Sequence, residues 1–169
     1  MSSFNEAINA EIRKLAELPN TLFIGQSLRY DGAAIYNSLD GVPMNKRIEF
    51  PVAEEFQMGY CIGLALSGIL PICIYPRIDF MVLAMNQLVN HLDKLPLYGW
   101  APKMIIRTTV GKKTPLDAGP QHTQNHADAF RAMLRHVKVI ETTGAATVPI
   151  AYAAAIESPC STIIVENQL

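Results

Sequence analysis

Charged side chains are scarce in this sequence, and the basic ones are not clustered. Only 17% of its 169 residues are Asp, Glu, Lys or Arg, and 14 basic residues against 15 acidic ones give a net charge of −1. Proteins bind nucleic acids through clustered Lys and Arg side chains that neutralise phosphates. We therefore expect no nucleic-acid partner.

Long apolar runs and a signal peptide are also lacking. A membrane-spanning helix needs about 20 consecutive apolar residues, and the apolar runs of this chain are shorter. Acidic residues interrupt the N-terminal segment, so it does not contain the apolar stretch of a secretion signal. These absences predict a cytoplasmic protein with no membrane partner.

Cysteine is rare, and no Cys or His spacing matches a metal site. Cys61, Cys73 and Cys160 stand in apolar surroundings without a C-x-x-C pair, which favours buried, reduced thiols. We predict no metal ligand in this chain. The patterns GxGxxG, GxxxxGK[ST] and GxSxG are absent too, which argues against the usual phosphate loops and against a serine nucleophile elbow.

Hydrophobic residues, in contrast, are abundant. They make up 50% of the chain, which is long enough to bury a core, and we expect one domain over residues 1–169. This composition is apolar for a small domain. We therefore expect another chain to cover part of its surface.

Short apolar segments alternate with helical patterns along the chain. An amphipathic helix is expected from Phe4 to about Leu15, where apolar residues recur every three or four positions. Strands are expected at 21–24, around 48, and at 69–75, 103–108, 137–140 and 162–165, with further helices at about 54–66, 79–95, 127–134 and 145–156. Such alternation predicts an α/β fold, a three-layer sandwich with a mostly parallel central sheet.

Ligands of such sheets bind beyond the carboxyl ends of the strands. The loops after Ile24, Tyr75 and Thr108 are therefore the places to look for chemistry. The connection over residues 110–125 is polar and longer than an ordinary loop, which is typical of a functional segment.

A carboxylate pair, Glu54 and Glu55, begins the helix that follows Pro51. A carboxylate at a helix N-terminus is favoured by the helix dipole and could serve a site. Acidic first turns are also common in helices with no such role. The residues alone leave both interpretations open.

Two histidines, His122 and His126, lie on or next to the long connection. His122 could act as an acid, a base or a hydrogen-bond donor, or it could be a solvated loop residue. A spacing of four would suit a metal on a helix, but Gly119 and Pro120 disfavour a helix there.

The order of several short motifs resembles that of one protein family. The segments are Ala7-Ile8-Asn9, Leu22-Phe23-Ile24-Gly25, Tyr30-Asp31-Gly32, Arg47-Ile48, Pro51-Val52-Ala53-Glu54, Gly68-Ile69-Leu70-Pro71-Ile72-Cys73, Asp79-Phe80, Asn86-Gln87-Leu88-Val89-Asn90, Ile106-Arg107-Thr108, Gly119-Pro120-Gln121-His122-Thr123-Gln124 and Val137-Lys138-Val139-Ile140. Together they resemble the transketolase-like pyrimidine-binding domain of thiamine-diphosphate enzymes. The similarity is greatest to the beta subunit of pyruvate and branched-chain 2-oxo acid dehydrogenases.

The resemblance implies roles for four residues. Glu54 matches the glutamate that hydrogen-bonds the aminopyrimidine ring nitrogen of thiamine diphosphate and is catalytic. Phe80 matches an aromatic residue beside the pyrimidine, and Tyr75 is a candidate for the same wall. His122 resembles a catalytic histidine on the substrate side of the thiazolium. The implied reaction is that of a 2-oxo acid dehydrogenase, a decarboxylase or a transketolase.

The resemblance also implies a partner. In the family, a separate pyrophosphate-binding domain holds the diphosphate and its Mg²⁺ through a GDG motif, and this sequence has no GDG. We therefore expect an alpha-type partner subunit that supplies most of the contacts to Mg²⁺. Two copies of the present chain would form a homodimer core within the hetero-oligomer.

The sequence departs from the family in three places. Gln26 stands where an acid is usual, Gly111-Lys112-Lys113-Thr114 replaces a glycine-rich run, and the sequence does not continue into the C-terminal domain. Two alternatives to the enzyme therefore stay open. One is a non-catalytic assembly or regulatory module that keeps the fold, and the other is a fragment of a longer subunit.

Overall fold

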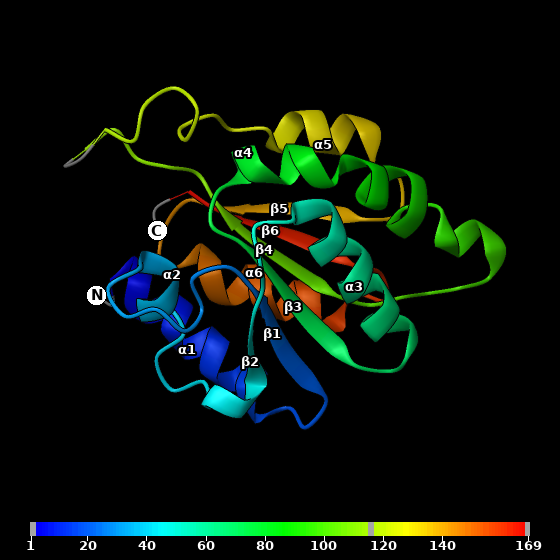
Figure 1. Ribbon diagram of the computed structural model, residues 1–169, viewed down its shortest axis with the longest axis horizontal. Helices are drawn as coiled ribbons and strands as arrows, with labels where there is room; N and C mark the ends of the chain where they lie inside the picture. The colour runs from blue at the N-terminus through cyan, green and yellow to red at the C-terminus, as the bar shows by residue number, and fades with distance from the viewer. Residues whose placement is uncertain (1–2, 115–116, 168–169) are drawn as a thin grey trace.

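The computed structural model describes residues 3–114 and 117–167, and six strands in this part form one sheet (Figure 1). The strands are β1 (Thr21–Gly25), β2 (Arg47–Glu49), β3 (Leu70–Tyr75), β4 (Ile105–Thr109), β5 (Lys138–Thr142) and β6 (Thr162–Glu166). Their order is β2-β1-β3-β4-β6-β5, and every neighbouring pair is parallel. The expected parallel sheet is confirmed.

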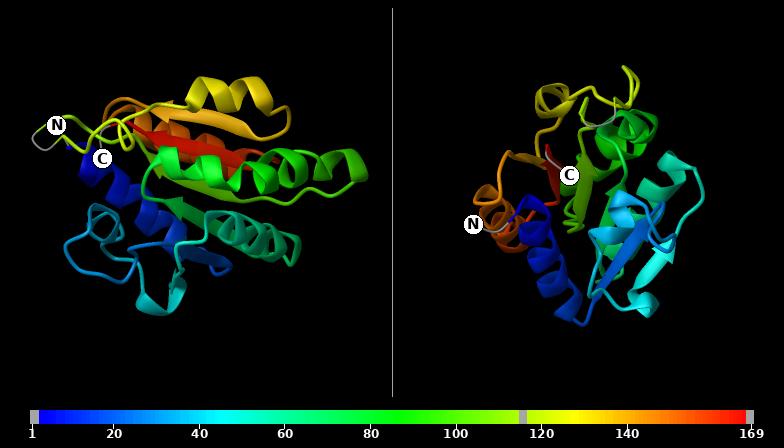
Figure 2. Two further views of the ribbon diagram at one scale, coloured as in Figure 1. Left: turned by 45° about the horizontal axis from the view of Figure 1, so that its top comes forward. Right: turned by 90° about the vertical axis from the view of Figure 1, so that its left-hand side faces the viewer.

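Helices cover both faces of this sheet (Figure 2). The α-helices are α1 (Phe4–Glu17), α2 (Ala34–Asn37), α3 (Glu54–Leu66), α4 (Ile78–Met81), α5 (Ala127–Met133) and α6 (Thr147–Glu157). One core lies between the sheet and α3, α4 and α5, and a second lies between the sheet and α1 and α6. The predicted three-layer sandwich is therefore confirmed.

The central strand β3 shows why its sequence is apolar at every position. Ile72 and Ile74 point into the α1–α6 core, whereas Cys73 and Tyr75 point into the other. All four side chains are fully buried. Because both faces of a parallel sheet are covered, neither set of alternating positions can be polar.

The helix expected from about 79 to 95 is not one continuous α-helix. After α4 come a 3₁₀ turn, η2 (Val82–Ala84), a π-helix, η3 (Asn86–Leu92), and a second 3₁₀ turn, η4 (Leu95–Tyr98). The expectation was wrong because apolar spacing does not separate these helix types, which differ by only one residue in their hydrogen bonding.

The cysteines are free, but they are not all buried. Cys61 and Cys73 are fully buried, as expected, whereas Cys160 is only partly buried near the amino edge of β6.

Across the residues that the structure describes, no helix is both long and apolar enough to cross a membrane.

A buried aspartate joins the end of η3 to the start of β5. Asp93 Oδ1 accepts from the backbone N–H groups of Arg135, His136 and Val137 at 2.7–3.0 Å, and Oδ2 accepts from Lys94 Nζ at 2.9 Å. Burial alone would raise the pKa of Asp93, but these donors together outweigh it and hold the pKa at about 2. The carboxylate therefore fixes where β5 begins.

Asp93 makes stability depend on pH. Its folded pKa of about 2 lies below the ordinary value of 3.8. Its contribution, about 2 kcal/mol, is therefore complete above about pH 4 and is lost as the pH falls towards 2. Urea unfolding of Asp93→Asn should show this deficit at neutral pH and a smaller one near pH 3. Asp128→Asn, at a side chain 95% exposed, is the control, and an Asp93→Asn deficit that does not change with pH would contradict the assignment.

Candidate functional site

The candidate residues gather at the carboxyl edge of the sheet. β1 ends at Gly25, β3 at Tyr75 and β4 at Thr109. β1 lies between β2 and β3 in the sheet. The chain therefore passes from β1 to β2 on one side and then crosses to β3 on the other side of β1. This reversal is the topological switch point at which α/β sheets bind ligands.

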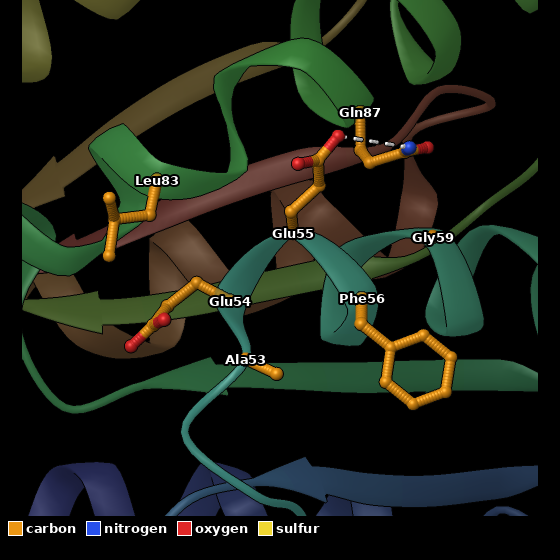
Figure 3. Close-up of a pocket in the computed structure, with 7 residues that line it drawn as sticks. All are labelled: Ala53, Glu54, Glu55, Phe56, Gly59, Leu83 and Gln87. Atoms are coloured by element: carbon orange, nitrogen blue, oxygen red, sulfur yellow. Dashed lines mark hydrogen bonds between the residues drawn. The ribbon is translucent and has the colours of Figure 1, made fainter.

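Glu54 is the first residue of α3 and is almost completely buried, with 6% of its surface exposed. Its Oε1 accepts a hydrogen bond from Gln26 Nε2 at 3.2 Å. The carboxylate lines a cavity of about 620 Å³ with Ala53, Phe56 and Leu83 (Figure 3). A buried carboxylate held at a helix N-terminus and open to a cavity can hydrogen-bond a ligand there.

Tyr75 supports Glu54 from beneath. Its hydroxyl donates to the backbone carbonyl of Glu54 at 2.9 Å, and its side chain is fully buried in the core. Burial raises the pKa of Tyr75, so the hydroxyl stays protonated as a donor. This placement favours a supporting role over the predicted place in the wall of a ligand pocket.

The neighbouring carboxylate, Glu55, has a different environment. It is exposed, and Oε1 accepts from Asn86 Nδ2 at 2.8 Å and, at 3.5 Å, from Gln87 Nε2 (Figure 3). Glu55 thus connects α3 to η3. The two acids that looked equivalent in sequence are distinguished by burial.

Phe80 and His122 are brought together, although they lie on separate segments. Their rings are perpendicular, with centroids 5.5 Å apart. Both line a second cavity of about 230 Å³, together with Ser27, Pro76 and Arg77. The four predicted site residues are thus divided: Glu54 lines the first cavity, Phe80 and His122 line the second, and Tyr75 is in the core.

A glycine sets the position of the loop that carries His122. A Cβ atom at Gly111 would lie 2.0 Å from the carbonyl oxygen of His122, far closer than atoms can approach. Only glycine lets the segment after β4 pass this close to His122.

The nearby His126 lies 4.0 Å from Asp79. Within residues 3–114 and 117–167, no group of three or more His, Cys, Asp or Glu side chains could hold a metal.

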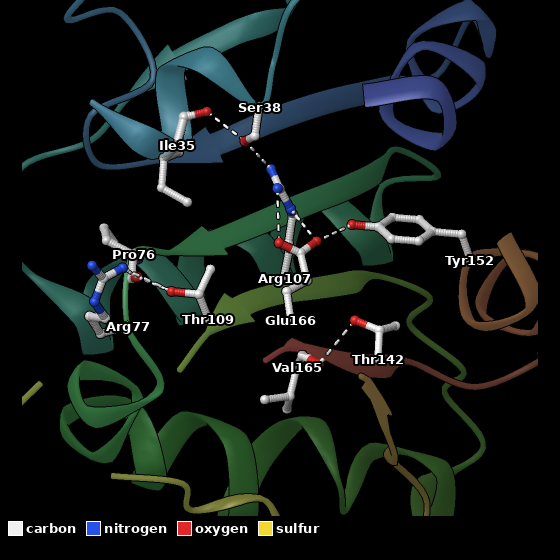
Figure 4. A network of polar contacts seen from close by, with 10 residues as sticks. All are labelled: Ile35, Ser38, Pro76, Arg77, Arg107, Thr109, Thr142, Tyr152, Val165 and Glu166. Atoms are coloured by element: carbon white, nitrogen blue, oxygen red, sulfur yellow. Dashed lines mark hydrogen bonds and ion pairs between the residues drawn. The ribbon is translucent and has the colours of Figure 1, made fainter. Parts of the chain in front are cut away.

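A buried ion pair braces the same edge of the sheet (Figure 4). Arg107 donates from Nε and Nη2 to the two carboxylate oxygens of Glu166 at 2.6 and 2.9 Å, and from Nη1 to Ser38 Oγ at 2.8 Å. Tyr152 also donates to Glu166, at 2.6 Å. Burial opposes the charge of Arg107, but Glu166 raises its pKa, so the pair stays ionised. It joins β4, β6, α6 and the end of α2.

Two site residues were not assigned these positions from the sequence. Gln26 was noted only as a departure from the family, whereas the structure shows it bonded to Glu54. Arg77 was not singled out, yet it lines the second cavity. It stands two residues after Tyr75, in one of the loops predicted to carry chemistry. The rule that ligands bind beyond the carboxyl ends of strands could therefore have identified it.

Known proteins with similar sequences are dehydrogenase subunits. No protein-family profile matches the chain. It is 27% identical to the mitochondrial pyruvate dehydrogenase E1 component subunit beta of Chaetomium thermophilum, over 99% of this chain and 44% of that protein. For the Saccharomyces cerevisiae subunit the values are 26%, 97% and 46%. The chain thus spans about half the length of the curated relatives it matches.

Two solved structures that share this fold are transketolases. A split-gene transketolase, described as an inactive beta4 tetramer, matches with a TM-score of 0.75 at 18% identity, over 99% of this chain and 52% of that one. Transketolase from Campylobacter jejuni matches with a TM-score of 0.76 at 16% identity, over 96% and 25%. The predicted resemblance to transketolase-like domains and dehydrogenase beta subunits is confirmed.

Replacing Arg107 should unfold the protein more easily. Arg107→Leu would leave Glu166 buried without its counter-charge, which costs about 3–5 kcal/mol. Arg13→Leu, in the exposed pair with Asp40, should cost at most about 1 kcal/mol. Urea unfolding measures both. A loss no larger in Arg107→Leu than in the control would contradict the bracing role.

Gly111→Ala should displace the loop that holds His122. The added methyl group meets the carbonyl of His122, so the contact between His122 and Phe80 should open. The ring-proton shifts of His122 in NMR should then move towards those of an unfolded chain. Gly144→Ala is the matched control, because a Cβ there meets nothing within 4 Å. Unchanged His122 shifts in Gly111→Ala would refute this constraint.

Proposed function

We propose that this chain, which resembles the pyrimidine-binding domain of thiamine-diphosphate enzymes, binds the aminopyrimidine half of that cofactor. The reaction would be decarboxylation, dehydrogenation or ketol transfer on a 2-oxo acid or a ketose. The observation that carries the proposal is Glu54, an almost fully buried carboxylate that lines a cavity at the start of α3.

The residues of the first cavity fit the cofactor ring. A carboxylate can accept or share the proton of a ring nitrogen, and Gln26 holds Oε1 of Glu54 in one place. Tyr75 fixes the backbone beneath it. Ala53, Phe56 and Leu83 supply apolar surface beside Glu54, and Glu55 and Gln87 supply the polar part of the lining. The apolar side chains would limit the access of water to the contact.

Each candidate residue has a limited task in this proposal. Thiamine diphosphate, when bound, would supply the reactive thiazolium that adds to the substrate carbonyl. Glu54 would hold a proton at the pyrimidine nitrogen in the first cavity. Phe80 lines the second cavity, so its predicted packing by the ring would require the bound cofactor to extend from the first cavity towards the second. His122, which faces the second cavity, would donate a hydrogen bond to the substrate oxygen.

The diphosphate and Mg²⁺ would be held by another chain. This sequence has no GDG motif, and the surface beside Glu54 is apolar and exposed at Val52 (81%), Phe56 (63%) and Leu83 (65%). Exposed apolar side chains grouped around a buried carboxylate suit an interface. The partner would be an alpha-type, pyrophosphate-binding subunit, with two copies of this chain forming the core of the assembly.

A second function is favoured by Gln26. Its amide stands where the family usually has an acid and cannot pass a proton to Glu54 as a carboxyl group can. A chain that keeps the fold but has lost the chemistry would serve as an assembly or regulatory module. Cofactor binding separates the two functions, because such a module has no need of it.

Glu54→Gln should lower kcat strongly, whereas Glu55→Gln should not. The chain is purified with the alpha-type subunit from the same organism and supplied with thiamine diphosphate and Mg²⁺. Because an amide cannot share a proton as a carboxyl group can, Glu54→Gln should lower kcat about 100-fold or more. Glu55→Gln removes the same charge from an exposed neighbour and should stay within about threefold of wild type.

Calorimetric titration with thiamine diphosphate completes this test. Heat of binding in the wild-type complex supports the enzyme, and its absence supports the assembly module. Full activity of Glu54→Gln would exclude the proposed role of Glu54. A matching melting temperature for the two variants shows that any difference lies in the site and not in folding.

A further inference from the structure

The second cavity has the size and position of a subsite for a small group. Its volume of about 230 Å³ lies below the range of roughly 300–1,000 Å³ of drug-sized ligand pockets. Ser27 follows β1, and Pro76 and Arg77 follow β3. The cavity therefore opens at the switch point between the two strands, beside Phe80.

Arg77 brings a guanidinium without a counter-charge to this cavity. Nη1 donates to the carbonyl of Pro76 at 2.7 Å and to Thr109 Oγ1 at 2.9 Å, which orients the group (Figure 4). Among the described residues, Nε and Nη2 have no hydrogen-bond acceptor, and no carboxylate lies within 4.0 Å of the side chain. A partly buried guanidinium with two nitrogens that have no acceptor is suited to bind an anion.

The other groups at the cavity agree with an anionic ligand. None of the residues that line it is acidic, and His122 adds a second polar group that can donate. Gly111 lies close to Arg77, because a Cβ atom added at Gly111 would be 3.1 Å from Nε of Arg77. Lys112 and Lys113 follow Gly111 in the chain. The two lysines make the segment that follows Gly111 basic.

The backbone beside the cavity is strained. Ser27 has a φ of 62°, an unfavourable conformation for a residue with a side chain. It is held there by Glu49, which accepts from the backbone N–H of Ser27 and of Leu28, each at 2.7 Å. Strain held in place by surrounding contacts is typical of ligand sites, and here it lies at a residue that lines the same cavity as Arg77.

We infer that Arg77 binds the anionic group of the substrate in this second cavity, with His122 beside it. The inference rests on the proposed function and narrows it to anionic substrates. The anion is the carboxylate of a 2-oxo acid or the phosphate of a sugar phosphate, both of which present two oxygens to a guanidinium. A neutral ketose would leave Arg77 without its partner.

The test uses the full chain alone, without thiamine diphosphate or a partner. Isotope-labelled protein is titrated with pyruvate, with inorganic phosphate and with the neutral analogue hydroxyacetone, while NMR follows the Arg77 Nε–H and the His122 ring. One anion should shift both signals saturably, and hydroxyacetone should shift neither. Preference for pyruvate indicates a 2-oxo acid, and preference for phosphate indicates a sugar phosphate.

Variants decide whether Arg77 is responsible. Arg77→Met should weaken binding of the preferred anion by about tenfold or more, because hydrogen bonds to a charged group are lost. Arg77→Lys keeps the charge but not the planar, two-pronged guanidinium. Its affinity for the anion should therefore lie between those of the wild type and of Arg77→Met. Arg135→Met, which removes an exposed arginine before β5, is the matched control and should bind as wild type.

Two results would overturn the inference. One is wild-type anion affinity in Arg77→Met, and the other is a wild-type protein in which neither anion shifts the Arg77 signal. Either can occur while Glu54 still binds the cofactor, and anion binding can persist in a chain that binds no cofactor. Failure here is therefore distinct from failure of the proposed function.

Discussion

The parallel pairing of β1 with β3 is the constraint on which the site depends. It sets Gly25 against Ile74 so closely that a Cβ at Gly25 would lie 2.3 Å from the carbonyl oxygen of Ile74. The loops after both strands consequently begin side by side. Gln26 and Ser27 on one loop and Pro76 and Arg77 on the other then lie at one edge of the sheet.

That edge carries buried charge, and its charged groups are stabilised in different ways. Arg107 and Glu166 neutralise each other inside the sheet, where a lone charge would be very costly. Glu54 is buried at a helix start with one hydrogen bond from Gln26 and with a cavity beside it. The first arrangement satisfies every charge internally, whereas the second leaves capacity for a ligand. This difference separates a structural carboxylate from a candidate functional one.

In the proposed function, the chain offers one side of a binding site. Its buried carboxylate and its perpendicular Phe80–His122 pair lie in separate cavities, and exposed apolar side chains surround the first. A ligand enclosed from one side only would remain in contact with water. A second chain over the apolar surface, as proposed, would complete the enclosure, and it would fit a composition that is apolar for a small domain.

The strands, most of the helices and the position of Glu54 at a helix start could be predicted from the sequence, because they follow from local spacing and from the order of motifs. It also predicted the strand ends beside which Gln26, Ser27 and Arg77 lie. Only the fold shows the pairing of Gln26 with Glu54, the burial of Tyr75, the π-helix at 86–92 and the placement of Arg77 and His122 at one cavity. Each of these arises from contacts between segments distant in the chain, or from a small change in hydrogen bonding, and local patterns record neither.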